Sequence, residues 1–168
     1  MDQLVNSAAK WHFMFGSQVP VPLTIRLITG RGWGQGPTHS QNLHAWFAHI
    51  PGLRVFYPTF GVDFEQLLLE SFEHKYPSIF LEDRWVHQIS NENSPNKIVG
   101  RKTIARVLRE GADATLITFG FNSILGIQVC DFYQEYGTFI EHIDLVSIKP
   151  IDFESILKSV NKIGRAHV

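Results

Sequence analysis

The sequence has 168 residues and a formal net charge of -1, with 44% hydrophobic and 18% charged residues. This is the composition of an ordinary globular chain, long enough for one sizeable core or two small ones. The 15 lysines and arginines are scattered along the chain, so the charge pattern gives no support for nucleic-acid binding.

A single cysteine, Cys130, excludes an internal disulfide and fits a reducing compartment, so we expect a cytoplasmic protein. Apolar residues around Cys130 recur at helical spacing, which favours a buried small hydrophobe over a reactive thiol. No apolar run approaches the roughly 20 residues that span a bilayer, and nothing resembles a signal peptide, so we expect no membrane contact.

Helices and strands are predicted to alternate in the first half of the chain. Helical spacing of apolar residues predicts a helix over 2–14, and the β-branched run at 22–29 predicts a buried strand. A helix over 41–49 follows, capped by Ser40 and ended by Pro51 and Gly52, and then a strand at 53–58. Asp63 begins the next helix, which places Phe64, Leu67, Leu68 and Phe72 along one face. A strand at 77–83 comes after it. This alternation indicates an α/β fold, a parallel sheet with helices on both faces.

The character of the chain changes at 87–103, which is rich in Asn, Ser, Pro and charged residues. This stretch is too long for an ordinary connection, so we interpret it as a linker between a first domain at 1–86 and a second at 104–168. An αβ rhythm follows the linker, with segments at 105–111, 112–120 and 140–150 and helices over 122–136 and 152–162. Because the chain starts on a helix and ends on "GRAHV", typical of the start of a strand, we expect a fragment.

The stretch "GRGWGQG", residues 30–36, follows the predicted strand at 22–29. It matches neither the dinucleotide fingerprint nor the phosphate-binding P-loop. Alternating glycines allow backbone angles that other residues resist, and they allow a close approach to a ligand or to another part of the chain. The carboxyl end of a strand in an open α/β sheet is where ligands bind, so this loop is a candidate binding loop, with a plain surface loop as the alternative.

The candidate catalytic residue is His39, which lies between this loop and the next predicted helix. The positive end of a helix would favour its neutral imidazole, which can donate or accept a proton or a hydrogen bond. The alternative is a structural histidine. His44 and His49 follow at intervals of five, unlike the i, i+4 pair of a helical zinc site, so we expect no metal site.

Charged residues also end the strand at 77–83. We interpret Glu82, Asp83 and Arg84 as a solvated strand end with a local ion pair rather than as catalytic groups. Trp46 and Phe47 are interpreted as packing in the core or at a subunit contact rather than as a base-stacking surface.

Three stretches together resemble a known family: "MDQLVNSAAKWHFMFGSQVPVPLTIR", "THSQNLHAWFAHIPGLRV" and "YPSIFLED". They are similar to β subunits of thiamine-diphosphate-dependent 2-oxo acid dehydrogenases, pyruvate or branched-chain, within the transketolase-like family. The most specific part is the H-S-Q pattern that runs from His39 to Leu53; related transketolases and deoxyxylulose-phosphate synthases carry a T-H-Q variant instead. The resemblance covers essentially the whole chain.

The resemblance implies the back half of a transketolase-like pyrimidine-binding domain in 1–86 and the start of a transketolase C-terminal domain in 104–168. It implies oxidative decarboxylation of a 2-oxo acid and acyl transfer to lipoyl groups. The cofactor, thiamine diphosphate, would be shared with an α subunit that holds its diphosphate and magnesium, in an α2β2 assembly bound to a dihydrolipoyl acyltransferase core. His39 would reach into the active site, to stabilise an intermediate or to assist acyl transfer.

Departures from the family matter equally. The family glutamate that contacts the pyrimidine lies upstream of Met1, so the cofactor-binding residues here are unknown and residues 1–168 alone are expected to be inactive. The segment at 71–76, "SFEHKY", lacks the usual Asp or Asn, which makes a potassium ion doubtful. The 2-oxo acid is undetermined, and a eukaryotic source would imply the mitochondrial matrix. Alternatives of the same fold are a transketolase-like or deoxyxylulose-phosphate-synthase-like ketol transferase and a non-catalytic assembly module.

Overall fold

The computed structural model describes residues 1–30, 32, 34–89, 105–164 and 166–167. The interpretation of 87–103 as a linker therefore lies largely outside the described residues. A short 3-10 helix, η2 (Val86–Gln88), overlaps the start of that stretch, and Ile89 follows it. The other helices, in chain order, are η1 (Gln3–Ala8), α1 (Ala9–Met14), α2 (His44–His49), α3 (Gly61–Glu73), α4 (Phe121–Glu135) and α5 (Phe153–Ile163).

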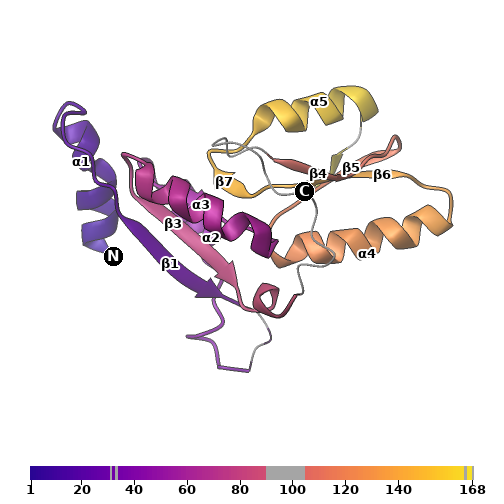
Figure 1. Cartoon of the computed structure of the whole chain (residues 1–168), viewed down its shortest axis with the longest axis horizontal. Helices are drawn as coiled ribbons and strands as arrows, with labels where there is room; N and C mark the ends of the chain where they lie inside the picture. Colours follow the sequence, from indigo (N-terminus) through magenta and orange to yellow (C-terminus); the bar gives the residue numbers. More distant parts are fainter. Residues whose placement is uncertain (31, 33, 90–104, 165, 168) are drawn as a thin grey trace.

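The first sheet has the strand order β1-β3-β2-β7. Its strands are β1 (Thr24–Thr29), β3 (Ser78–Asp83), β2 (Arg54–Phe56) and β7 (Ser147–Lys149). The first three are parallel, as the sequence predicted, whereas β7 runs antiparallel to β2. The carboxyl ends of the three parallel strands point toward the same edge of the sheet, and Figure 1 shows β1 and β3 running side by side in that direction.

Helices cover both faces of this sheet because its strands alternate their apolar side chains. Val55 and Ile79 pack with residues of α1 and α2 in one core cluster. Phe56 and Phe80, the residues that directly follow Val55 and Ile79, pack against Leu67 of α3 on the opposite face. The prediction of helices on both faces is thus confirmed in this sheet.

Two details of the predicted packing are wrong. Strand β1 is an edge strand rather than a buried one, and its Ile28 is 57% exposed, because no described strand pairs with its outer side. Phe72 is 53% exposed and does not share the core-facing side of α3 with Leu67. Helix α3 begins at Gly61, two residues before Asp63.

The second sheet has the order β4-β6-β5-β8. Its strands are β4 (Arg106–Arg109), β6 (Ile140–Asp144), β5 (Ala114–Thr118) and β8 (Ala166–His167). Figure 1 shows α4 and α5 on opposite sides of this sheet. Strand β8 confirms that "GRAHV" leads into a strand, and Cys130 on α4 is buried, as expected; burial raises the pKa of its thiol.

One predicted element is divided between the two sheets. The segment 140–150 forms β6 in the second sheet and then β7 in the first, with the buried Leu145 and Val146 between them. The backbone N–H of Tyr57 donates to Val146 O at 3.0 Å, next to the β2–β7 pairing. The second half of the chain therefore adds a strand to the sheet of the first half, through a pairing that is irregular between Val55 and Phe56.

A buried polar cluster lies where the halves meet, and we call its five residues the junction network: Thr59, Thr118, Ser123, His142 and Asp144. The Asp144 carboxylate accepts hydrogen bonds from Thr59 Oγ1 at 2.8 Å and Ser123 Oγ at 2.5 Å. Thr118 Oγ1 bonds both Ser123 Oγ at 2.8 Å and His142 Nε2 at 2.7 Å. Within the described residues, Asp144 Oδ2 and His142 Nδ1 have no hydrogen-bond partner.

Burial moves the two titratable groups of the junction network in opposite directions. It raises the pKa of Asp144 to about 6, against the opposing effect of the hydrogen bonds from Ser123 and Thr59 and of the nearby Arg106 charge. Burial lowers the pKa of His142 to about 4, and the positive charge of Arg109, at the far end of β4 from Arg106, contributes. Both side chains are therefore neutral near pH 5.

No helix in the part of the chain that the structure describes is long and apolar enough to cross a membrane.

Candidate functional site

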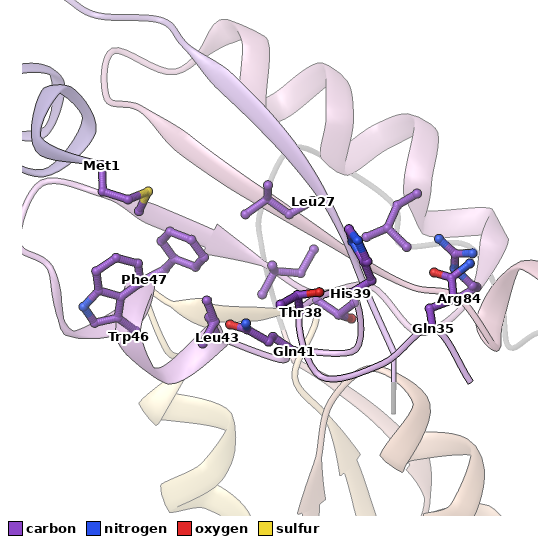
Figure 2. Close-up of a pocket in the computed structure, with 13 residues that line it drawn as sticks. Met1, Leu27, Gln35, Thr38, His39, Gln41, Leu43, Trp46, Phe47 and Arg84 are labelled. Carbon is purple, nitrogen blue, oxygen red and sulfur yellow. The ribbon is translucent and has the colours of Figure 1, made fainter. Parts of the chain in front are cut away.

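A cavity of about 490 Å³ opens at the carboxyl ends of β1 and β3 (Figure 2). This is the edge at which open α/β sheets bind ligands. Its walls come from β1, from the segment after the glycine loop, from α2 and from the residue after β3. The lining residues are Met1, Leu27, Ile28, Thr29, Gln35, Thr38, His39, Gln41, Leu43, Trp46, Phe47, Leu81 and Arg84.

The two ends of the pocket differ in chemistry. Figure 2 shows Met1, Trp46 and Phe47 grouped at one end, whereas Gln35 and Arg84 lie at the other. His39 lies between these ends. The pocket thus pairs an apolar wall with a small set of hydrogen-bonding and cationic groups, an arrangement typical of small-molecule sites.

The glycine loop is shaped by its backbone angles. Gly32, Gly34 and Gly36 have φ values of 66°, 80° and 76°, a region that disfavours residues with a Cβ. This part of the prediction is confirmed. A Cβ added at any of the three would meet no atom within 4 Å, so close approach to another described part of the chain is not the reason for glycine there.

The predicted cap at Ser40 is wrong. Helix α2 begins at His44, its N-cap position is Leu43, and no side chain caps it. Residues 41–43 have no helical structure. His39 therefore lies five residues before α2 rather than at its first turn, and the expected influence of the helix dipole on its ring has no geometric basis. The ring is instead exposed in the pocket.

Beneath the segment that carries His39 lies a second set of polar contacts, which we call the pocket-floor network: Thr29, Asn42, Tyr57 and Asp83. The Tyr57 hydroxyl is its centre, 2.7 Å from Thr29 Oγ1, 3.0 Å from Asn42 Nδ2 and 3.4 Å from Asp83 Oδ2. Burial, more than any other cause, raises the pKa of Tyr57 to about 12, so the phenol stays protonated. Sequence reasoning missed Tyr57 and Asn42; the position of Tyr57 directly after a strand was the available signal.

Glu82 and Asp83, at the end of β3, are buried rather than solvated, which corrects the prediction, whereas Arg84 after them is partly exposed. Glu82 and Asp83 are 3% and 6% exposed. Glu82 accepts hydrogen bonds from Arg26 of β1, at 2.5 and 2.9 Å, and lies 3.3 Å from His87 Nε2. The hydrogen bond to Glu82 raises the pKa of Arg26. Glu82 thus pairs with a residue of the neighbouring strand, and Arg84 lines the pocket.

The aromatic residues on α2 divide between two roles. Phe47 is buried in the core, as expected, and Trp46 remains 44% exposed against it at the rim of the pocket. His44 contacts Asn42 rather than a metal-binding partner. Among the described residues, no three His, Cys, Asp or Glu side chains gather where they could hold a metal ion.

Comparison with known protein families identifies both halves of the chain. Residues 1–86 match the pyrimidine-binding domain of transketolase, and residues 104–168 match the transketolase C-terminal domain.

Characterised relatives resemble the chain over nearly its full length. It is 37% identical over 165 residues to the pyruvate dehydrogenase E1 component subunit beta of Rickettsia bellii, covering 98% of this chain and 51% of that protein. It is 34% identical to the mitochondrial subunit of the same name from Saccharomyces cerevisiae, with 96% and 45% covered. It is 31% identical to the beta subunit of acetoin:2,6-dichlorophenolindophenol oxidoreductase from Cupriavidus necator, with 98% and 48% covered. The chain spans about half the length of these relatives.

Solved structures show the same fold. A split-gene transketolase, described as an inactive β4 tetramer, superimposes with a TM-score of 0.75 at 19% identity, over 98% of this chain and 53% of the other. A transketolase variant from Pichia stipitis gives a TM-score of 0.72 at 18% identity, over 96% and 24%. The architecture around the pocket is therefore that of transketolase-like proteins.

Proposed function

Because the chain belongs to the family of the transketolase pyrimidine-binding domain, we propose that it forms part of the β subunit of a thiamine-diphosphate-dependent 2-oxo acid dehydrogenase. The proposal rests above all on one observation: His39 lies in the cavity at the carboxyl ends of β1 and β3. Oxidative decarboxylation of a 2-oxo acid, with acyl transfer to a lipoyl group, is the reaction we assign to the complete protein. Residues 1–86 and 104–168 would be its two domains.

The residues around the pocket fit this cofactor in kind. The apolar wall of Leu27, Met1 and Phe47 suits a flat heteroaromatic ring, and the other end offers polar side chains for reacting groups. When bound, thiamine diphosphate supplies the nucleophilic carbon that attacks a 2-oxo acid and accepts the electron pair left as carbon dioxide departs. An α subunit would hold its diphosphate and magnesium, and we assign no potassium ion to this chain.

In this site the protein's own groups would hold protons and exclude water. The His39 imidazole, exposed in the pocket, would donate a hydrogen bond or a proton to the oxygen of the former 2-oxo group, where negative charge develops. Thr38 and Gln41 add hydrogen-bonding side chains beside it. The apolar wall would lower the local dielectric and strengthen each of these interactions.

A ketol transferase is the second candidate, and one observation favours it. Arg84 places a guanidinium at the polar end of the pocket, where it could pair with the phosphate of a sugar substrate. Identities of 37% and 34% to pyruvate dehydrogenase β subunits, against 19% to a transketolase of known structure, favour the dehydrogenase.

Partners and location follow from the proposed function. We propose an α subunit in an α2β2 assembly, a dihydrolipoyl acyltransferase core, and residues 41–50 with the apolar face of 2–14 as the contact surface. The location would be the cytoplasm in a bacterium and the mitochondrial matrix in a eukaryote, as the name of the yeast relative indicates for that protein. Because these residues cover about half of the relatives' length, we expect residues 1–168 alone to be inactive.

The test is carbon dioxide release from a panel of 2-oxo acids by the complete β subunit, co-produced with its α subunit, with and without thiamine diphosphate. Cofactor-dependent release is the expected result, and the preferred acid would identify the complex. Ketol transfer between sugar phosphates without such release would establish the second candidate. Neither activity, in an assembly that folds, would leave a non-catalytic module of the same fold.

A further inference from the structure

The position of His39 has to be set by its chain neighbours. Within the described residues, no side chain hydrogen-bonds to its ring, and the ring is exposed. Residues 38–42 have neither helix nor strand hydrogen bonds to fix their path. A side chain on such a segment samples many positions unless a neighbouring residue is anchored. The anchor that the structure provides is Asn42, three residues after His39.

The hydrogen-bonding capacity of Tyr57 is filled in one consistent way. Asn42 Nδ2 can only donate, so it donates to the Tyr57 oxygen at 3.0 Å. An ionised Asp83 can only accept, so the Tyr57 proton points toward Asp83 Oδ2, at 3.4 Å. Thr29 Oγ1, at 2.7 Å, then donates to the second lone pair. Tyr57 is 1% exposed, so its hydroxyl depends on these partners rather than on bulk solvent.

Matching donors with acceptors in the same way fixes both the nitrogen and the oxygen of the Asn42 amide. Its nitrogen donates to Tyr57, so the oxygen Oδ1 must be the acceptor for His44 Nδ1, at 2.7 Å. His44 therefore carries its proton on Nδ1. Burial lowers the pKa of His44, which agrees with a neutral ring. Asn42 is thus tied both to the floor of the pocket and to the first turn of α2.

The ring of Tyr57 is held from behind by the second half of the chain. Its centroid lies 5.6 Å from that of Phe119, and a Cβ on Gly120 would be 2.8 Å from the Tyr57 ring. Beside the hydroxyl, however, a small cavity of about 80 Å³ adjoins Asn42 and Asp83. Packing therefore fixes the ring, while hydrogen bonds rather than packing fix Asn42.

We propose that Tyr57 is a positioning residue for His39: its hydroxyl, held between Thr29 and Asp83, anchors Asn42 and so sets where the His39 imidazole stands in the pocket. This inference rests on the proposed function, because it assigns Tyr57 a role only through His39. Tyr57 does not touch the substrate. Since Phe119 and Gly120 back its ring, the second half of the chain contributes to the geometry of a pocket built by the first.

The experiment measures kcat and KM for the preferred 2-oxo acid in the complete α and β assembly, for Tyr57→Phe and Asn42→Ala, each alone and combined with His39→Ala. Tyr57→Phe keeps the ring and removes only the hydroxyl. The matched control is Thr115→Val, which removes a buried hydroxyl that bonds Ser159 Oγ at 2.7 Å, far from the pocket. Melting temperatures of all variants report the loss of stability.

We expect Tyr57→Phe and Asn42→Ala each to lower kcat by roughly tenfold, as misplacement of a reacting group does, with KM changed by less than about twofold. With His39 already replaced by alanine, the further loss from Tyr57→Phe should shrink to less than about twofold, since its effect passes through His39. Thr115→Val should lower the melting temperature without lowering kcat.

Two results would overturn the inference while leaving the proposed function intact. One is a kcat for Tyr57→Phe equal to that of Thr115→Val, in an enzyme that His39→Ala impairs. The other is an equal fold-loss from Tyr57→Phe with and without His39, as a merely structural role would give. A wild-type assembly with no cofactor-dependent decarboxylation would refute the proposed function itself, and the inference with it.

Discussion

Two polar networks draw on the same short stretch of chain after β2 and are built very differently. Tyr57 and Thr59 are two residues apart, yet the first belongs to the pocket-floor network and the second to the junction network. The pocket-floor network is centred on a phenol that stays neutral, and it reaches the pocket through Thr29. The junction network contains an aspartate and a histidine with strongly shifted pKa values and has no described contact with the pocket residues.

The difference separates two kinds of effect. Changes in the pocket-floor network should alter catalysis more than stability, because they move the segment that carries His39. Changes in the junction network should alter stability and its pH dependence, because they uncover or remove buried titratable groups. Each prediction below tests whether this division holds.

The largest expected effect is on the pH dependence of stability, through His142. Its pKa is about 4 in the folded protein, below its ordinary value of 6.5, so its contribution to stability is complete above pH 6.5 and is lost as the pH falls toward 4. The loss amounts to about 3 kcal/mol over that range. Because His142→Gln cannot titrate, its free energy of unfolding should decline less than that of the wild type between pH 7 and pH 4.5 in urea titrations. An equal decline in the free energy of unfolding for the wild type and His142→Gln would contradict this.

Asp144 should act in the opposite direction. Its pKa is about 6 when folded against 3.8, so its contribution is complete below pH 3.8 and is lost as the pH rises through 6. This loss is also about 3 kcal/mol. The same urea titrations should show that Asp144→Asn gains stability relative to the wild type between pH 4.5 and pH 7. If His142→Gln and Asp144→Asn change the pH dependence of the free energy of unfolding in the same direction, these two side chains are not the source of that pH dependence.

A steric change in the junction network should have the next largest effect. A Cβ on Gly126 of α4 would lie 2.5 Å from Cε1 and Nε2 of His142, whose ring is held by Thr118. Gly126→Ala should therefore lower the free energy of unfolding by about 2 kcal/mol despite the better helix propensity of alanine. Gln128→Ala, at an exposed position of the same helix, is the control and should change it little. Equal stability of the two variants would count against the packing described.

The smallest expected difference in stability, and the most specific comparison, is between Thr59→Val and Tyr57→Phe. Thr59→Val removes the hydroxyl that donates to Asp144, and we expect a loss of about 1 kcal/mol in the free energy of unfolding with kcat unchanged. Tyr57→Phe should lower the free energy of unfolding by a similar amount, yet also lower kcat. Denaturation curves and initial rates on the same preparations would show whether two residues with similar structural cost differ in function.

Much of the fold around the pocket could be predicted from the sequence because its signals are local. The β-branched run before the glycines and the apolar run at 78–81 predicted β1 and β3 with bounds that differ from the observed ones by at most two residues. The spacing of apolar residues predicted most of α3. The glycine loop and His39 were recognisable because they follow a strand, where parallel sheets place their sites. The resemblance to the transketolase-like family, also drawn from the sequence, is confirmed.

What could not be predicted depends on contacts between distant segments. Glu82 is buried only because Arg26 of the neighbouring strand neutralises it, which residue type alone cannot reveal. Ser40 has the right chemistry for a cap, but the chain stays non-helical through Leu43. The division of 140–150 between two sheets, and the meeting of Tyr57 with Thr29, Asn42 and Asp83, require the tertiary arrangement itself.

The central claim is that His39 performs chemistry in this pocket, and single-turnover decarboxylation tests it most directly. The complete assembly would be loaded with thiamine diphosphate and mixed with its preferred 2-oxo acid, for the wild type and for His39→Ala. We expect cofactor affinity to stay within about twofold and the single-turnover rate to fall by roughly 100-fold, as loss of an acid–base group does. An unchanged rate in a folded, cofactor-loaded His39→Ala assembly would contradict the account.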